Sequence, residues 1–227
     1  TPANREKLSS WLSHNAGQYP AVISGDLLIH GGLLASRLPQ GTINDEQNFL
    51  KLLQAMPSGE DITVFSIIPR LLVSDNLLPD AWYQWHLMRY STLRDIVEQF
   101  GDYHSTAQLE EIKNKIPQEI LQKYNVLYST NDSFNKQLAA LCAAKNYTLV
   151  IGQDDAQPFG LPNRNRTHAE AYMRRAGLSS ASTPTCGADE IAQMLTARRF
   201  CQINNYKPKF YIEYLSLIHI SEPTRRS

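Results

Sequence analysis

The sequence of 227 residues lacks an excess of charge of either sign and lacks any long apolar run. Lysine plus arginine and aspartate plus glutamate both number 22, so no global field favours nucleic acid or an anionic membrane surface. No run approaches the roughly 18 apolar residues of a membrane-spanning helix. The apolar content of 42% argues against a disordered or fibrous chain. We therefore expect a soluble globular protein that binds neither nucleic acid nor a membrane.

Cysteine is scarce, and several catalytic motifs are missing. Cys142, Cys186 and Cys201 lie far apart, without a CxxC pair or the spacing of metal ligands. We interpret them as free thiols of a reducing compartment and predict a cytoplasmic location. The sequence contains no GxGxxG or GK[ST] phosphate loop and no GxSxG nucleophile elbow. These absences argue against a dinucleotide-binding loop and against serine or cysteine nucleophiles.

The most informative stretch is an apolar run that stops at two adjacent carboxylates. Thr148 to Ile151 is β-branched and apolar enough for a buried strand, and the turn residues Pro158 and Gly160 cannot extend it. Asp154 and Asp155 should therefore lie just beyond the carboxyl end of a strand. In a parallel α/β sheet, ligands bind at this edge because the loops converge there.

A second group of candidates follows the first predicted strand. The segment Ala21–His30 reads as that strand and reaches a carboxylate at Asp26. A backbone-capping role for Asp26 is as compatible with the pattern as a ligand role. Gly31 and Gly32 then form a tight turn, which would let a ligand approach the backbone.

The clearest strand of the chain, Ile62–Ile68, is a near-continuous apolar run that ends at Pro69-Arg70. Arg70 at this edge is suited to binding a carboxylate or phosphate with two parallel hydrogen bonds. A structural ion pair with Asp26 or Asp154 is the alternative for Arg70. Arg37 is a second candidate for holding an anionic group.

Helical patterns fill much of the remaining sequence. They predict helices at Arg5–Ala16, at Asp45–Met56 with Asn44 as N-cap, at Asn163–Ala176 and at Ile191–Phe200. A helical insertion is expected at about 79–146, with a core stripe of Trp82, Trp85, Leu93, Ile96 and Phe100. Short strands are expected at Ser182–Thr185 and Lys209–Tyr214. The predicted fold is α/β, a mostly parallel sheet flanked by helices, in a single domain over residues 1–214.

The last 13 residues differ from the rest. Leu215 to Arg225 resembles the translation of a sequencing adaptor read in frame, so residues 215–227 are predicted to be a non-native tail. The alternative is a native apolar strand, Leu215–Ile220, followed by a polar tail. The codons of the encoding DNA distinguish the two.

Four stretches together resemble one family: GDLLIHGGLLASR, VFSIIPR, IGQDDAQPFG and GADEIAQMLTARR, in this order. They are similar to the DUF4127 family, bacterial proteins named only as a domain of unknown function. The resemblance implies that this chain is a fragment of a longer protein. Family members carry an arginine-rich RxRN-like patch before the QDD motif, and the matching place here keeps Asn131 but not the arginines. No activity is implied by the resemblance.

Three functions remain open at this level. The first is a metal-assisted enzyme acting on a small polar metabolite or sugar derivative, with Asp154 and Asp155 as catalytic groups and a divalent ion such as Mg²⁺ on Asp26 and Asp154. Arg37 and Arg70 would hold an anionic group of the ligand. The second is a small-ligand-binding protein without chemistry. A third hypothesis, a helical interaction scaffold, requires an exposed apolar face on the insertion. The sequence leaves the oligomeric state open.

Overall fold

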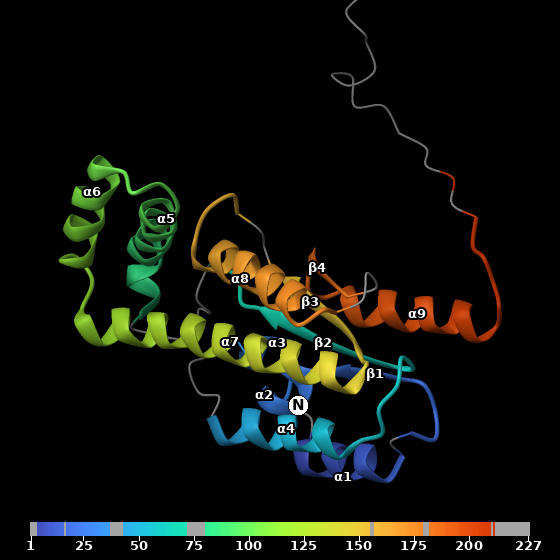
Figure 1. Ribbon diagram of the computed structural model, residues 1–227. Coiled ribbons are helices and arrows are strands. Elements are labelled where there is room, and N and C mark those ends of the chain that lie inside the picture. The colour runs from blue at the N-terminus through green and yellow to red at the C-terminus, as the bar shows by residue number, and fades with distance from the viewer. Residues whose placement is uncertain are drawn as a thin grey trace, which may run out of the picture.

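The computed structural model describes residues 4–15, 17–36, 43–71, 80–154, 157–178, 182–209 and 211. Its centre is an all-parallel sheet with the strand order β1-β2-β3-β4 (Figure 1). The strands are β1 (Ala21–Ser24), β2 (Ile62–Ile68), β3 (Thr148–Gln153) and β4 (Thr183–Cys186). Parallel pairing brings the carboxyl ends of all four strands to one edge of the sheet, and the predicted α/β fold is confirmed.

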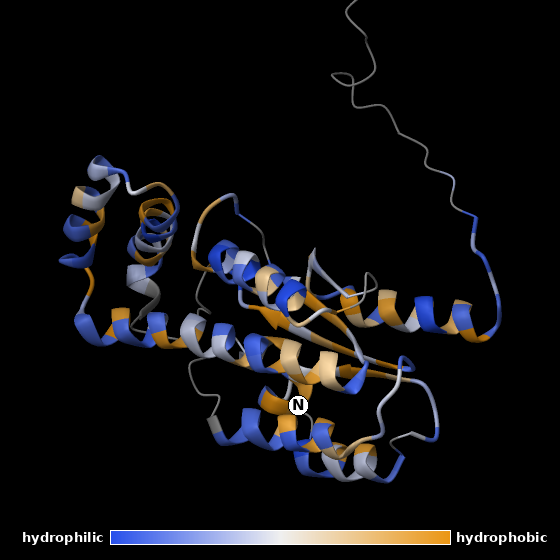
Figure 2. Ribbon diagram, viewed as in Figure 1, coloured by the Kyte–Doolittle hydropathy of each residue, from blue (hydrophilic) through white to orange (hydrophobic). Residues whose placement is uncertain are grey.

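The two central strands are buried on both faces, as their continuous apolar runs predict. β2 and β3 pair over six residue positions, from Thr63 opposite Thr148 to Ile68 opposite Gln153. Figure 2 shows apolar residues concentrated on these strands, with polar residues on the outward sides of the helices. Burial on both faces requires helices on each side of the sheet.

Most of the helices that pack on the sheet cover one face, and α9 covers the other. The first face packs Ile23, Val64 and Ile151 against apolar residues of α1 (Arg5–Asn15), α2 (Gly25–His30), α4 (Ile43–Ala55), α7 (Gln118–Lys145) and α8 (Leu161–Arg175). A short helix, α3 (Leu33–Ser36), follows α2. On the second face, Phe65, Ile67 and Val150 pack against Ile191 and Leu195 of α9 (Ile191–Ile203).

The approach of α9 to the sheet is close at Gly152 of β3. A β-carbon at this position would collide with the side chain of Ile191 and with the carbonyl oxygen of Gly187. Only glycine therefore fits here without displacing the helix.

The predicted helical insertion is present and has its own core. It consists of a 3₁₀ turn, η1 (Asp80–Tyr83), then α5 (Gln84–Phe100), α6 (Tyr103–Lys113) and the first half of α7. Figure 1 shows α5 and α6 standing apart from the sheet. Their apolar residues form a separate cluster with Tyr124, Tyr128 and Leu161. We refer to η1, α5, α6 and the first half of α7 as the helical arm.

The predicted core stripe of the arm is partly wrong. Leu93 is buried, but Trp82, Trp85 and Phe100 are 83%, 77% and 66% exposed. The buried side of α5 carries Leu87, and Trp85, two residues earlier, is rotated by about 200° from it. Phe100 is the last residue of α5, at the end of the packed face.

The segment Ala21–His30 is only partly a strand, which corrects the prediction. The strand ends at Ser24, whose hydroxyl oxygen accepts the N–H of Leu27 at 3.2 Å and caps α2. The helix ends at Gly31, which has a φ of 84°. Asn44 also differs from the prediction, because α4 starts at Ile43 and places Asn44 inside the first turn.

The C-terminal predictions fall mostly outside the described residues. Of the predicted strand Lys209–Tyr214, only Lys209 and Tyr211 are described, and neither lies in a strand. The proposed tail at 215–227 lies wholly outside the described part. Within the described chain, the search for a helix of sufficient length and apolarity to cross a bilayer found none.

Candidate functional site at the carboxyl edge of the sheet

Three of the predicted site residues follow the ends of neighbouring strands. Asp26 lies in the first turn of α2, directly after β1, while Arg70 follows β2 and Asp154 follows β3. The backbone N–H of Asp154 donates to the carbonyl oxygen of Ile68 at 3.1 Å, which extends the pairing of β2 and β3 by one residue. All three residues therefore lie at one edge of the sheet. Their role as ligands or catalysts stays a prediction.

The other predicted site residues are less informative. Gly31 and Gly32 form the turn after α2, with φ values of 84° and 147°. A β-carbon on Gly32 would meet no atom within 4 Å, so the need for glycine there is conformational. Arg37 and Asp155 lie outside the described residues.

Asp26 is a buried carboxylic acid with an unusual affinity for protons. The residue is 6% exposed, and its Oδ2 accepts the backbone N–H of Ile67 at 2.9 Å. Burial raises the pKa of Asp26 from 3.8 to about 7, and this effect outweighs its hydrogen bonds with Ile67 and Ser36. The negative charge of Asp154 raises the pKa further. Asp26 therefore gains and loses a proton near neutral pH.

A small polar cavity of about 40 Å³ lies beside Asp26, between α2, α4 and α7. Its polar lining consists of Asp26, His30, Ser36, Glu46, Ser66, Thr130 and Asn131. A water molecule needs roughly 10–15 Å³ by this measure, so the cavity has room for a few waters or for one small group of a ligand.

Two more ionisable groups of this cavity are shifted by burial. Glu46 on α4 is 7% exposed, and burial raises its pKa from 4.5 to about 7. Burial lowers the pKa of His30 from 6.5 to about 4, an effect that Arg5 strengthens and Asp45 opposes. The cavity thus joins two acids that titrate near neutrality with an imidazole that stays neutral there.

Glu46 was missed by the sequence analysis. The signal that could have found it is its spacing from Phe49, Leu50 and Leu53, which places Glu46 on the apolar face of α4 at steps of three, four and seven residues. An acidic residue in the first turn of a helix is more often an exposed partner of the helix dipole.

Polar side chains of α7 hold the end of β2 in place. Tyr128 donates its hydroxyl to the carbonyl oxygen of Arg70 at 2.6 Å, and Tyr124 donates to that of Leu71 at 3.2 Å. Asn131 donates to the carbonyl oxygen of Ile67 at 3.1 Å. Asn131, the residue kept from the family's RxRN-like patch, therefore bridges α7 to the edge that carries Asp26.

Within the described residues, no further metal ligand joins Asp26 and Asp154, the two predicted ligands of a divalent ion. Across the described residues, no group of three or more His, Cys, Asp or Glu side chains is arranged to hold a metal ion. Asp26 and Asp154 supply two carboxylates, and one oxygen of Asp26 already accepts the N–H of Ile67. A divalent ion on this pair would take its remaining ligands from water or substrate.

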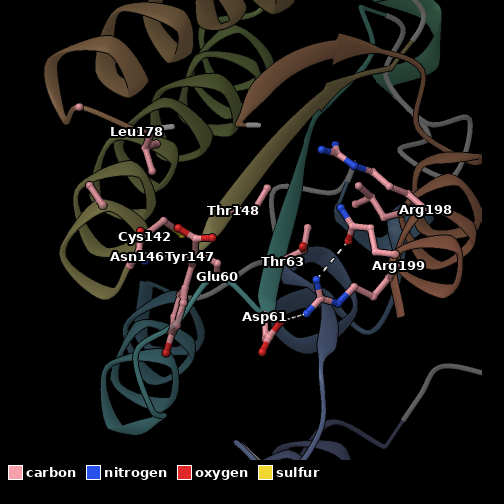
Figure 3. Close-up of a pocket in the computed structure, with 14 residues that line it drawn as sticks. Glu60, Asp61, Thr63, Cys142, Asn146, Tyr147, Thr148, Leu178, Arg198 and Arg199 are labelled. Atoms are coloured by element: carbon pink, nitrogen blue, oxygen red, sulfur yellow. Dashed lines mark hydrogen bonds and ion pairs between the residues drawn. The ribbon is translucent and has the colours of Figure 1, made fainter. Parts of the chain in front are cut away.

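A second cavity, of about 340 Å³, lies at the opposite, amino edge of the sheet (Figure 3). Thr63 and Thr148 line it at the starts of β2 and β3, and Arg198 and Arg199 enter it from α9. Arg199 forms an ion pair with Asp61 and donates to Gln202 at 3.1 Å. None of the predicted site residues that the structure describes lines this cavity.

The fold and the carboxyl edge define the class of this protein: it is an α/β protein with a parallel sheet, in which Asp26, Arg70 and Asp154 follow the ends of β1, β2 and β3. The chain belongs to the DUF4127 family, described as a protein of unknown function, because the family model matches residues 1–218. A comparison with curated proteins and one with solved structures gave no match.

Proposed function

We propose that this protein is an enzyme acting on a small polar metabolite or sugar derivative at the carboxyl edge of the sheet. One observation carries the proposal: Asp26 and Glu46 line the same cavity, and burial raises the pKa of both to about 7. An acid with a pKa near the working pH both donates and accepts protons readily. Two such acids supply a proton donor and a proton acceptor in one site.

The size of the cavity limits how a substrate binds. A volume of about 40 Å³ admits one hydroxyl or carbonyl group but not a whole metabolite. The reacting group would therefore enter between Asp26 and Glu46, and the rest of the molecule would lie at the sheet edge near Arg70 and Asp154. The hydroxyl groups of Ser36, Ser66 and Thr130 around the cavity are suited to a polar group of this kind.

A metal-assisted form of the reaction belongs to the same proposal. A divalent ion such as Mg²⁺ at Asp26 and Asp154 would replace the proton on Asp26 and polarise the bound oxygen. The cytoplasmic location is likewise part of the proposal. It is supported by Cys142, Cys186 and Cys201, which are free thiols.

The alternative is a protein that binds the same kind of ligand without chemistry. In that case a compound that stabilises the natural chain should be converted neither by the natural chain nor by Asp26→Asn. Turnover of a bound compound by the natural chain that is lost in Asp26→Asn would identify the enzyme.

The interaction-scaffold hypothesis has one supporting observation, the exposure of Trp82 and Trp85. Phe100 lies 15 residues after Trp85 on α5, or about 22 Å along the helix axis at 1.5 Å per residue. The three aromatic side chains therefore form no continuous apolar face, and we rank this hypothesis third.

The proposal is tested by thermal shift on the natural chain and on Asp26→Asn, Glu46→Gln and Asp154→Asn. The probes are MgCl₂, MnCl₂ and a panel of sugars and hydroxy acids. At least one probe should raise the melting temperature of the natural chain and have a smaller effect on all three variants. Compounds that bind are then assayed for turnover.

Asp61→Asn is the matched control, because it makes the same chemical change at the opposite edge of the sheet. It should respond to every probe as the natural chain does. If the stabilising probes act equally on Asp26→Asn, Glu46→Gln and Asp154→Asn, the ligand binds elsewhere and the proposal is wrong.

A further inference from the structure

A groove of about 760 Å³ runs along the outer side of α7 and α8, apart from the carboxyl-edge cavity. Asp132, Ser133 and Lys136 of α7 face the groove, whereas Thr130 and Asn131 face the cavity. The volume is in the range of sites that bind small molecules.

A histidine–aspartate pair lies in the groove. The Nδ1 atom of His168 on α8 lies 3.2 Å from both carboxylate oxygens of Asp132. Tyr172 donates its hydroxyl to Oδ2 of the same carboxylate at 3.1 Å. These contacts place the Nδ1 proton toward Asp132 and fix the ring. The side chain of His168 is 37% exposed and lines the groove, so a ligand in the groove can reach it.

The lining of the groove is cationic. Arg94, Lys136 and Arg164 contribute three positive charges and Asp132 one negative charge, before any charge on His168. The whole chain has a net charge of zero, so this is a local concentration of positive charge. Arg164 lies 3.7 Å from Glu98, and Lys136 Nζ lies 5.9 Å from the centre of the Tyr172 ring. Such a surface attracts anions.

The rest of the lining consists mainly of uncharged hydrogen-bonding groups. Amides of Gln118, Gln122 and Asn125 and the hydroxyl groups of Ser129 and Ser133 surround the cations. Groups of this kind bind the hydroxyls of a sugar, while a cluster of arginine, lysine and histidine binds its phosphate.

We propose that this groove binds a phosphorylated sugar, with its phosphate held by Lys136 and by the Nε2–H of protonated His168. Asp132 accepts the other N–H of the imidazolium and balances its charge. The site is separate from the carboxyl-edge cavity and does not depend on the function proposed there.

The proposal predicts that anion binding in the groove depends on pH. The charged and titratable groups that face His168 are Asp132 and Lys136 from α7, Arg164 and Tyr172 from α8, and Arg94 from α5. A protonated imidazole donates from both ring nitrogens, whereas a neutral imidazole with its hydrogen on Nδ1 has no hydrogen on Nε2 to donate to an anion. Anion binding should therefore weaken as the pH rises from 6 to 8.

The first experiment titrates the chain with sodium sulfate by NMR at constant ionic strength. Sulfate is chosen because its charge is the same at pH 6 and pH 8. We expect the affinity to be roughly tenfold higher at pH 6, the size of one charge-assisted hydrogen bond. His168→Gln, which can still donate to Asp132, should remove this difference, and Lys136→Ala should weaken binding about three- to tenfold at both pH values.

His104→Gln and Lys7→Ala are the matched controls, since both residues are exposed and lie outside the groove. They should bind sulfate as the natural chain does. A site elsewhere, such as the cavity with Arg198 and Arg199, would leave sulfate binding unchanged in His168→Gln and Lys136→Ala and would overturn the proposal. An affinity for sulfate that is equal at pH 6 and pH 8 would also overturn it.

A second titration tests the sugar. Glucose 6-phosphate should bind more tightly than sulfate, and Gln122→Ala should reduce its affinity without changing that of sulfate. Equal affinities for glucose 6-phosphate and sulfate would contradict a phosphorylated sugar as the ligand.

Discussion

The two edges of the sheet carry the same residue type in opposite surroundings. At the carboxyl edge, Asp26 is 6% exposed and has a pKa raised by burial to about 7. At the amino edge, the side chain of Asp61 is 77% exposed and pairs with Arg199. Burial makes the first aspartate sensitive to pH near neutrality, whereas water and a cation surround the second. The comparison shows that the environment of a carboxylate, and not its presence, marks a candidate site.

The largest expected effect is that of Asp26→Asn on the pH dependence of stability. The folded chain holds a proton on Asp26 up to about pH 7, while the unfolded chain releases it near 3.8. The natural chain therefore loses stability as the pH rises from 4 to 8, by on the order of 4 kcal/mol for three pKa units. Asparagine does not titrate, so the free energy of unfolding of the variant should lack this dependence on pH.

Urea unfolding of both chains at pH 4 and pH 8 measures the difference. The free energy of unfolding of Asp26→Asn, relative to the natural chain, should be higher at pH 8 than at pH 4. A constant difference between the two chains would show that burial does not shift Asp26, and the contrast between the edges would disappear.

A smaller effect of opposite direction is expected from His30 in the same cavity. Its lowered pKa keeps it neutral in the folded chain, while the unfolded chain takes up a proton below about pH 6.5. The stability due to neutral His30 is present above pH 6.5 and is lost as the pH falls toward 4. His30→Gln should reduce the loss between pH 7 and pH 5 by roughly 1–2 kcal/mol.

The same unfolding experiment at pH 7 and pH 5 checks this expectation, because the contribution of Asp26 is common to the natural chain and His30→Gln and cancels in their difference. His104→Gln serves as the control, because His104 is exposed on α6. If both histidine variants change the pH dependence equally, the burial of His30 has no thermodynamic consequence.

The smallest effect should come from Asp61→Asn at the amino edge. Breaking an exposed ion pair costs about 0–1 kcal/mol, and added salt should diminish the difference further. The measurement is urea unfolding at pH 7 with and without 1 M NaCl. A loss well above 1 kcal/mol that persists in salt would mean that the two edges are more alike than their exposure suggests.

The sequence predicts the central strands and their common edge well, because these features are local. An apolar run that ends at Pro69 or Asp154 indicates both a buried strand and where it stops. The misreading of Ala21–His30 arose because apolar residues continue past Ser24. The capping hydroxyl of Ser24 was the available signal for the start of a helix there.

Most of the candidate site depends on contacts that are distant in sequence. Burial of Glu46 and His30 depends on how α4 and α7 pack, which spacing along one helix does not reveal. His168 and Asp132 are 36 residues apart and meet only because α7 and α8 are neighbours. The exposure of Trp85 likewise depends on which side of α5 faces the rest of the arm.

A single long helix, α7, connects the helical arm to the sheet. It is one helix of 28 residues, about 42 Å long at 1.5 Å per residue. Its first half belongs to the helical arm and its second half to the sheet, and Tyr124, Tyr128 and Asn131 attach its middle to the end of β2. Asn131 of this helix therefore contacts Ile67 directly, the residue whose backbone N–H is accepted by Asp26.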